Sequence, residues 1–353
     1  MHSLYDAIEK TLNTLNYSYQ NPKPLAAAIL KASDYFIKRA GASPWADPDF
    51  CAAYIAHFLP MNVFRLRQGL IRLQQPQILQ LLHHTPVYDY GCGPLTFLIA
   101  YTLTFKQWPY SYKYFDLDPR APRLGLQILK QTLTRMATET QHDKPTASLS
   151  QELPTHLTPL NQVSSDHIVT LSYSLNELPE ALRLQFLNFK HLLIFEPSMR
   201  TTSRQLLEFR SIALKQGFFS LAPCFHSLAC PMLTHSQKDW CFDRASIDLP
   251  PQALNLYKHL PFDQEQATFS YLLLSQTEAA SVAATPWARV VGDTLKEKGK
   301  TRTMICRDER REFLAVLKKQ KLDLKLHRGE AIQIPESTEI KGNELRITSL
   351  PES

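Results

Sequence analysis

The chain has 353 residues, of which 44% are hydrophobic and 20% are charged, and its formal net charge is +6 at pH 7. It holds only 10 glycines, whereas average usage gives about 25, and this depletion excludes flexible linkers, collagen-like repeats and compositional disorder. At ~100 to 200 residues per domain, the length predicts two or three packed units. We expect a helical N-terminal region at 1–80, an α/β domain at 81–280 with a cysteine-rich insertion at 222–265, and a small basic β-rich unit at 285–353.

The compartment follows from cysteine usage and from the first residues. Six cysteines are too few for a secreted disulfide scaffold, and no charged-then-apolar leader opens the chain. Asp6 and Glu9 precede Lys10, which argues against an organellar transit peptide, and no run approaches ~18 apolar residues, so no membrane span is expected. We expect a cytoplasmic, bacterial protein that is a monomer.

The first 80 residues predict helices. Apolar residues follow helical spacing from Leu4 to Leu15 and from Leu25 to Phe36, and Pro24 suits the first turn of the second helix. A third helix is expected to start at Asp47 and to be interrupted by Pro60.

From Pro86 the pattern changes to short apolar runs that alternate with longer amphipathic stretches, which is typical of βαβ units on a parallel sheet. We expect strands at 87–90, 112–115, 167–171, 192–195, 218–221 and 268–275, with helices at 96–105, 119–135, 179–189 and 200–216. Short β-like runs at 289–291, 302–306, 329–334 and 344–348 predict the terminal unit.

The segment from Val87 to Pro94 (Val-Tyr-Asp-Tyr-Gly-Cys-Gly-Pro) places an acid and two glycines between the first expected strand and a helix. Glycine lets the backbone turn sharply and approach a ligand closely, and the helix N-terminus presents free N–H groups. A dinucleotide fingerprint needs a third glycine where Thr96 stands, which weakens an NAD or FAD interpretation. The Asp-x-Gly-x-Gly form resembles motif I of class I S-adenosylmethionine (SAM) methyltransferases, with a tight turn that binds no ligand as the alternative.

That resemblance implies a set of cofactor-binding residues. Asp116 ends the next expected strand, where a carboxylate can accept both ribose hydroxyls, and Asp118 is the second choice. Leu95 stands where many of these enzymes have a third glycine, and its side chain would crowd the cofactor. The residues expected to bind SAM are Asp89, Gly91, Gly93 and Asp116.

A polar segment, Ser172 to Pro179, follows the expected strand at 167–171. Ligands of open α/β sheets bind at the carboxyl edge of the strands, so Asn176 and Glu177 are candidates for a catalytic or substrate pocket. The alternative is that they cap the next helix. No general base follows from the sequence.

Three cysteines, Cys224, Cys230 and Cys241, lie in an irregular stretch with little hydrophobic periodicity, and Cys306 lies far downstream. A bound metal would supply the missing order, since thiolates hold zinc and iron–sulfur clusters. The spacing lacks the short knuckles of structural zinc sites and mildly favours a cluster, with zinc or unrelated buried thiols as alternatives. His226 and His235 are alternative ligands, although each is more typical of a surface or hydrogen-bonding histidine.

Positive charge is concentrated between Lys296 and Arg328, where 12 Lys and Arg residues against five acidic residues give a net charge of +7. Such a segment is typical of a protein with a phosphate-rich partner, because each cation that neutralises a phosphate releases condensed counterions. A solvated, lysine-rich surface is the alternative.

Several separated segments together resemble one family, the methyltransferase-like proteins associated with the mitochondrial small ribosomal subunit and their bacterial relatives. The resemblance covers roughly residues 45 to 310, and its most specific part is a Pro-Cys-x-His segment combined with Trp-Cys. The segments occur in the family's order: Tyr54–Asn62, Asp89–Pro94, Ser174–Pro179, Phe195–Pro197, Ala222–His226, Cys230–Pro231, Asp239–Cys241 and Phe269–Leu272.

The resemblance implies a Rossmann-like class I methyltransferase sheet, a four-cysteine [4Fe-4S] cluster, and a role on small-subunit rRNA or in its assembly. Three positions depart from the family pattern, with Phe225 in place of a proline and Ser198 and Leu95 in place of glycines. The matching metal ligands are Cys224, Cys230, Cys241 and, as the distant fourth, Cys306.

We therefore expect a SAM-dependent methyltransferase-like protein that acts on small-subunit rRNA or in small-subunit assembly, is stabilised by an iron–sulfur cluster, and has rRNA or a ribosomal precursor as its partner. A non-catalytic rRNA-binding assembly factor is the first alternative, favoured by Leu95 and by the lack of an Asn-Pro-Pro-aromatic tetrad. A zinc-containing small-molecule methyltransferase is the second.

Overall fold

The computed structural model describes residues 1–38, 43–139, 155–224, 226–263, 265–277 and 287–351. The chain divides into two compact units, the first made of Met1–Ser172 with Ala245–Ala267 and the second of Tyr173–Arg244 with Thr268–Ser353. The three-part division expected from the sequence stays a prediction. Within the described residues, no helix is both long enough and apolar enough to cross a membrane.

The first unit begins with the expected helices, but Pro60 does not interrupt the third one. After α3 (Pro48–Ala53) the chain forms a π-helical turn, η1 (Tyr54–Phe58), and continues as α4 (Leu59–Ile71). Pro60 lies in the first turn of α4, and the Ala56 carbonyl, which an N–H four residues later would bond, accepts a hydrogen bond of 2.8 Å from the Tyr19 hydroxyl instead. The remaining helices of this region are α1 (His2–Thr14), α2 (Pro22–Lys38) and α5 (Pro76–His84).

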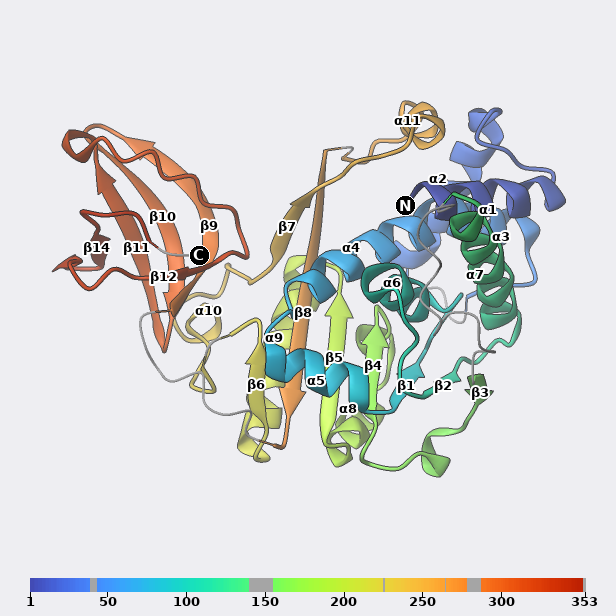
Figure 1. Ribbon diagram of the computed structural model, residues 1–353, viewed down its shortest axis with the longest axis horizontal. Coiled ribbons are helices and arrows are strands. Elements are labelled where there is room, and N and C mark those ends of the chain that lie inside the picture. The colour runs from blue at the N-terminus through green and yellow to red at the C-terminus, as the bar shows by residue number, and fades with distance from the viewer. Residues whose placement is uncertain (39–42, 140–154, 225, 264, 278–286, 352–353) are drawn as a thin grey trace. The chain divides into compact units, whose positions relative to one another are not determined.

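Four parallel strands form the sheet of the first unit in the order β3-β2-β1-β4 (Figure 1). They are connected through α6 (Thr96–Phe105) and α7 (Arg120–Glu139), and α11 (Pro251–Tyr257) also belongs to this unit. Helix α6 is buried at every residue from Thr96 to Leu103, as expected of a helix that is apolar all round. The strands are β1 (Val87–Tyr90), β2 (Tyr112–Phe115), β3 (Thr155–Leu157) and β4 (Ile168–Ser172).

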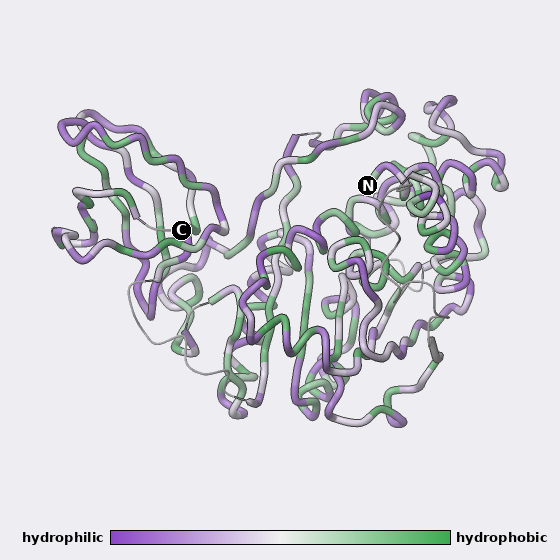
Figure 2. Tube along the Cα trace, in the orientation of Figure 1, coloured by the Kyte–Doolittle hydropathy of each residue, from purple (hydrophilic) through white to green (hydrophobic). Residues whose placement is uncertain are grey.

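In the second unit, β5 (His191–Glu196) and β6 (Phe219–Ala222) both pair antiparallel with β8 (Gln266–Ser275). Every residue of β5 is buried, and Figure 2 shows the hydrophobic colour along it. The helices are α8 (Glu180–Gln185), α9 (Arg200–Lys215) and α10 (Pro231–Thr234), and the short strand β7 (Asp243–Ser246) follows them. The two strand sets have the order and directions found in the two halves of a Rossmann-like sheet, so the α/β fold class is confirmed.

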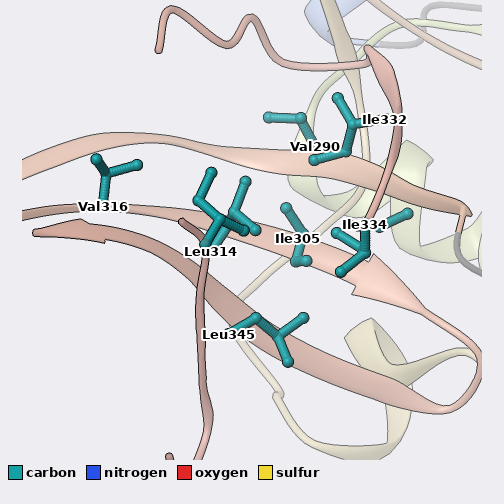
Figure 3. Close-up of a cluster of buried hydrophobic side chains, with 9 residues drawn as sticks. Val290, Ile305, Leu314, Val316, Ile332, Ile334 and Leu345 are labelled. Carbon is teal, nitrogen blue, oxygen red and sulfur yellow. The ribbon is translucent and has the colours of Figure 1, made fainter. Parts of the chain in front are cut away.

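The second unit also contains a six-stranded sheet in the order β12-β9-β10-β11-β14-β13. Val290, Ile305, Leu314 and Leu345 pack together in its apolar core (Figure 3). The sequence analysis missed β11, because the start of this strand is a run of charged residues, and it also missed β13. The strands are β9 (Trp287–Glu297), β10 (Lys300–Arg307), β11 (Arg310–Leu317), β12 (Ala331–Gln333), β13 (Glu339–Lys341) and β14 (Glu344–Arg346), with a 3-10 helix, η6 (Lys318–Gln320), after β11.

Candidate functional site: a glycine turn and a thiol pocket

The turn between β1 and α6 uses the left-handed backbone region three times. Gly91 has φ 69°, Gly93 has φ 51° and Leu95 has φ 55°. A leucine in this region carries a backbone cost of about 1–2 kcal/mol that glycine avoids, yet the Leu95 side chain is completely buried. The position of the expected third glycine therefore has the conformation that favours glycine, but it is held by an apolar side chain.

Asp116 holds the turn in place. Its Oδ2 accepts a hydrogen bond of 2.8 Å from the Gly93 N–H, and its Oδ1 accepts one of 3.0 Å from the Asp118 N–H. Burial raises the pKa of Asp116, whereas the hydrogen bond from the Arg120 guanidinium lowers the pKa of Asp118. Each oxygen of Asp116 keeps a second acceptor position, so the carboxylate can position the turn and still accept a ribose hydroxyl.

Asp89 lies inside the sheet rather than on the surface of the turn. Its Oδ2 accepts a hydrogen bond of 2.6 Å from the Tyr112 hydroxyl, and its Oδ1 accepts one of 2.9 Å from the Thr170 hydroxyl. The side chain is completely buried, and burial raises its pKa to about 7. Asp89 thus joins β1 to the strands on either side of it.

Two residues that sequence reasoning did not assign to the site lie against the turn. A Cβ added at Gly125, in α7, would overlap the backbone carbonyl of Pro94, so only glycine permits this approach of helix to turn. The Tyr54 hydroxyl would lie 3.7 Å from a Cβ at Gly93, and Tyr54 starts the π-helical turn, a feature frequent at functional sites. Tyr54 begins one of the segments quoted for the family resemblance, but nothing in the sequence pairs Gly125 with Pro94.

The close approach at Gly125 gives a prediction whose sign is unusual. Gly→Ala inside a helix ordinarily stabilises a protein by roughly 0.5–1 kcal/mol. We expect Gly125→Ala to lower the free energy of unfolding by about 1–3 kcal/mol instead, because the new methyl group displaces the Pro94 backbone. Chemical denaturation measures the change, with Gln127→Ala at an exposed position of α7 as the control. A stabilised Gly125→Ala protein would contradict the described contact.

The raised pKa of Asp89 predicts a pH-dependent loss of stability. Its pKa lies above the ordinary value of 3.8, so the folded state favours the protonated form, and this contribution is present at low pH and is lost as pH rises toward 7. We expect the free energy of unfolding of the unmodified protein, relative to Asp89→Asn, to fall between about pH 4 and pH 7. Asp118→Asn is the matched control: because the pKa of Asp118 is lowered, its contribution should change in the opposite direction and below about pH 4, so its difference should stay nearly flat between pH 4 and pH 7. A flat Asp89→Asn difference would mean that Asp89 is ionised in the fold without cost.

The remaining pocket candidates belong to the second unit. Asn176 and Glu177 lie in a 3-10 turn, η4 (Leu175–Glu177), and the Asn176 N–H donates a hydrogen bond of 3.2 Å to Glu196 Oε1. Glu196 ends β5 and is buried, and burial raises its pKa to about 8. The sequence analysis quoted the segment Phe195–Pro197 but assigned no role to Glu196. Glu177, which it did name as a candidate, is exposed. The four residues expected to bind SAM all belong to the first unit.

The four cysteines expected as ligands line one pocket of the second unit. They arrive from four places: the loop after β6, the start of α10, the segment before β7, and β10. Cys230, Cys241 and Cys306 also pack in one apolar cluster with Leu207 and Val291. Burial raises the pKa of Cys230 to about 12, raises that of Cys241, and raises that of Cys306 well above the ordinary value. Burial therefore favours the neutral thiol form of these three cysteines.

Arginine side chains order the irregular loops that carry these cysteines. Arg204 Nη1 donates hydrogen bonds to the carbonyl oxygens of Met232, Ser236 and Asp239 at 2.8–3.2 Å. Arg210, completely buried, donates to the carbonyls of Leu228 and His226. Both arginines lie on α9, so this helix supplies order that the sequence attributed to a metal.

A metal site is not formed by the described side chains as they lie, although the four cysteines line one pocket. In the part of the chain that the structure describes, no group of three or more His, Cys, Asp or Glu side chains is arranged to hold a metal ion. His226 lines the pocket, and its Nδ1 accepts the Leu228 N–H, while burial lowers its pKa to about 4. His235 is exposed and is not among the residues that line the pocket. Arg210 and Arg289 also line the pocket, and Arg289 forms a buried ion pair with Asp243.

The basic segment is partly neutralised by acids that lie inside it and by acids from other parts of the second unit. Arg302 pairs with Glu297, Arg307 with Glu312, and Arg328 with Asp293. Lys300 and Arg311 also form ion pairs, with Glu344 and Asp239. Much of the charge counted along the sequence therefore stabilises the terminal sheet.

Together, the strand orders and the glycine turn that Asp116 holds define an α/β protein of the class I methyltransferase-like type. A family model described as mitochondrial small ribosomal subunit Rsm22 matches residues 50–332. The chain belongs to this family. No curated protein sequence matches it.

Solved structures with low similarity to this chain include methyltransferases. Magnesium protoporphyrin IX methyltransferase from Synechocystis PCC 6803 with bound SAH has 9% identity and a TM-score of 0.30, covering 62% of this chain and 84% of that one. Precorrin-6y C5,15-methyltransferase from Geobacter metallireducens has 9% identity and a TM-score of 0.32, covering 60% and 86%. The 16S rRNA methylase ArmA has 12% identity and a TM-score of 0.30, covering 70% and 97%. Such low scores carry no conclusion about chemistry.

Proposed function

We propose that this chain is a SAM-dependent methyltransferase-like protein that acts on small-subunit rRNA, or in small-subunit assembly, and is stabilised by an iron–sulfur cluster. The observation that carries the proposal is membership of the Rsm22 family, whose description names the mitochondrial small ribosomal subunit. The partner is then rRNA or a ribosomal precursor. A cytoplasmic location and a monomeric state stay predictions.

The glycine turn supports the SAM part of the proposal. Gly91 and Gly93 let the backbone approach a ligand, and Asp116 is the acceptor for the ribose hydroxyls. Asp89 supports the turn indirectly, because its hydrogen bonds with Tyr112 and Thr170 fix the end of β1 inside the sheet. SAM, when bound, supplies an electrophilic methyl group, and Asn176 and Glu177 remain the pocket candidates.

One observation favours the second candidate function, a non-catalytic assembly factor. Leu95 fills the left-handed position of the turn with a buried side chain, so the turn keeps its shape through packing that needs no cofactor. A protein of this kind would keep the fold as a scaffold for rRNA.

SAM binding separates the two candidates. We expect calorimetry to detect SAM binding by the unmodified protein, and Asp116→Ala to weaken it at least tenfold, about 1.4 kcal/mol, because the ribose acceptor is lost. Asp118→Ala is the control and should bind nearly as well, since its carboxylate pairs with Arg120. No heat at millimolar SAM with the folded protein would leave the assembly factor as the function.

The pocket shared by the four cysteines supports the cluster part. Anaerobically purified protein should contain about four iron and four sulfide per chain, as a [4Fe-4S] cluster requires. Cys306→Ser should lose most of this iron, whereas Cys51→Ser, a cysteine in the first unit, should retain it. Stoichiometric zinc in place of iron would support the zinc alternative, and unchanged iron in Cys306→Ser would remove Cys306 from the ligands.

A further inference from the structure

Two lysine-bearing segments meet at one end of the terminal sheet. The end of β9 carries Lys296, the turn after it carries Lys298, and η6 with the residue after it carries the other three lysines. The Lys318 N–H donates a hydrogen bond of 2.9 Å to the Gly299 carbonyl, which joins the two segments. We name this surface the lysine tip; its members, all exposed, are Lys296, Lys298, Lys318, Lys319 and Lys321.

The lysine tip carries positive charge that its surroundings do not neutralise. No ion pair involves any of its five lysines among the residues that the structure describes, which distinguishes them from the arginines of the same segment. The acid within the tip, Glu297, pairs with Arg302. Figure 2 shows the hydrophilic colour where the chain turns between β9 and β10.

At the opposite end of the same strands, the positive charges are paired with acids. Residues 307–312, which include the turn between β10 and β11 and the adjoining strand ends, hold three arginines and three acids, and both Arg307 and Arg310 pair with acids of this stretch. The excess charge is therefore gathered at one end of the sheet rather than spread along it.

We infer that the lysine tip binds the phosphate backbone of RNA. Lysine ammonium groups on flexible stems act as mobile point charges, which suits phosphates presented without a fixed geometry, and such contacts position a protein without reading sequence. The choice of RNA over other polyanions rests on the proposed function, through the ribosomal family. The lysine tip then contributes affinity for RNA, and recognition of a particular nucleotide requires residues outside the tip.

The test is the salt dependence of binding to an in vitro transcript of small-subunit rRNA, measured with the full chain. Each phosphate contact contributes roughly 0.7–0.9 to the slope of log K against log salt. Replacing the five tip lysines by glutamine should reduce the slope by about 3–4 and the affinity at least tenfold, if most of them contact phosphates. All five are exposed, so the fold should be retained, which circular dichroism checks.

A matched control removes the same charge elsewhere, from exposed lysines of the first unit: Lys10, Lys23, Lys38, Lys130 and Lys258. If this control reduces the slope as much as the tip variant does, net charge alone explains binding and the inference is overturned. If the unmodified protein does not bind the transcript, the proposed rRNA role itself fails. The inference about the lysine tip is also overturned if the five substitutions weaken binding to phosphatidylserine vesicles but leave binding to RNA unchanged.

Discussion

The reversal of the chain between β1 and α6 is the constraint on which the first unit depends. Three left-handed residues make it, and only two of them are glycines. Burial of a leucine is worth about 1.5–3 kcal/mol, enough to offset the backbone cost at Leu95. Asp116 fixes the loop from the neighbouring strand, and Gly125 lets α7 close on it. In a chain with few glycines, Gly91 and Gly93 stand where the turn needs a left-handed backbone, and Leu95 shows that packing can replace a third glycine there.

The thiol pocket obtains its order in a different way. Arg204 and Arg210 donate to five backbone carbonyls of a segment that has little hydrophobic periodicity, and both project from α9. Buried carbonyl groups need such partners, because an unsatisfied one costs roughly 1–3 kcal/mol. The need for order is therefore no argument for a metal. The cluster proposal depends instead on four thiols from distant parts of the sequence that line one pocket.

Sequence reasoning succeeded where a periodic signal ended at a glycine or proline. The bounds of β1, β2 and α6 are those predicted, because an apolar run and the glycine turn mark them. It failed at Pro60, since a π-helical turn that absorbs the proline has no sequence signature. It missed β11 because ion pairs, rather than apolar alternation, mark its start, and it missed the role of Arg210 because carbonyl partners are chosen only by the fold.

Strand β10 serves two interiors at once. Ile305 faces the apolar core of the terminal sheet, while its neighbours Met304 and Cys306 pack toward the thiol pocket, as the alternation of side chains along a strand requires. Gly292 in β9 permits the close approach of Met304, next to a shift in the pairing register. A slip of one residue would bury the Cys306 thiol in the sheet core and turn Ile305 into the pocket. The position of the Cys306 thiol is thereby tied to the register of a hairpin whose far end carries lysines.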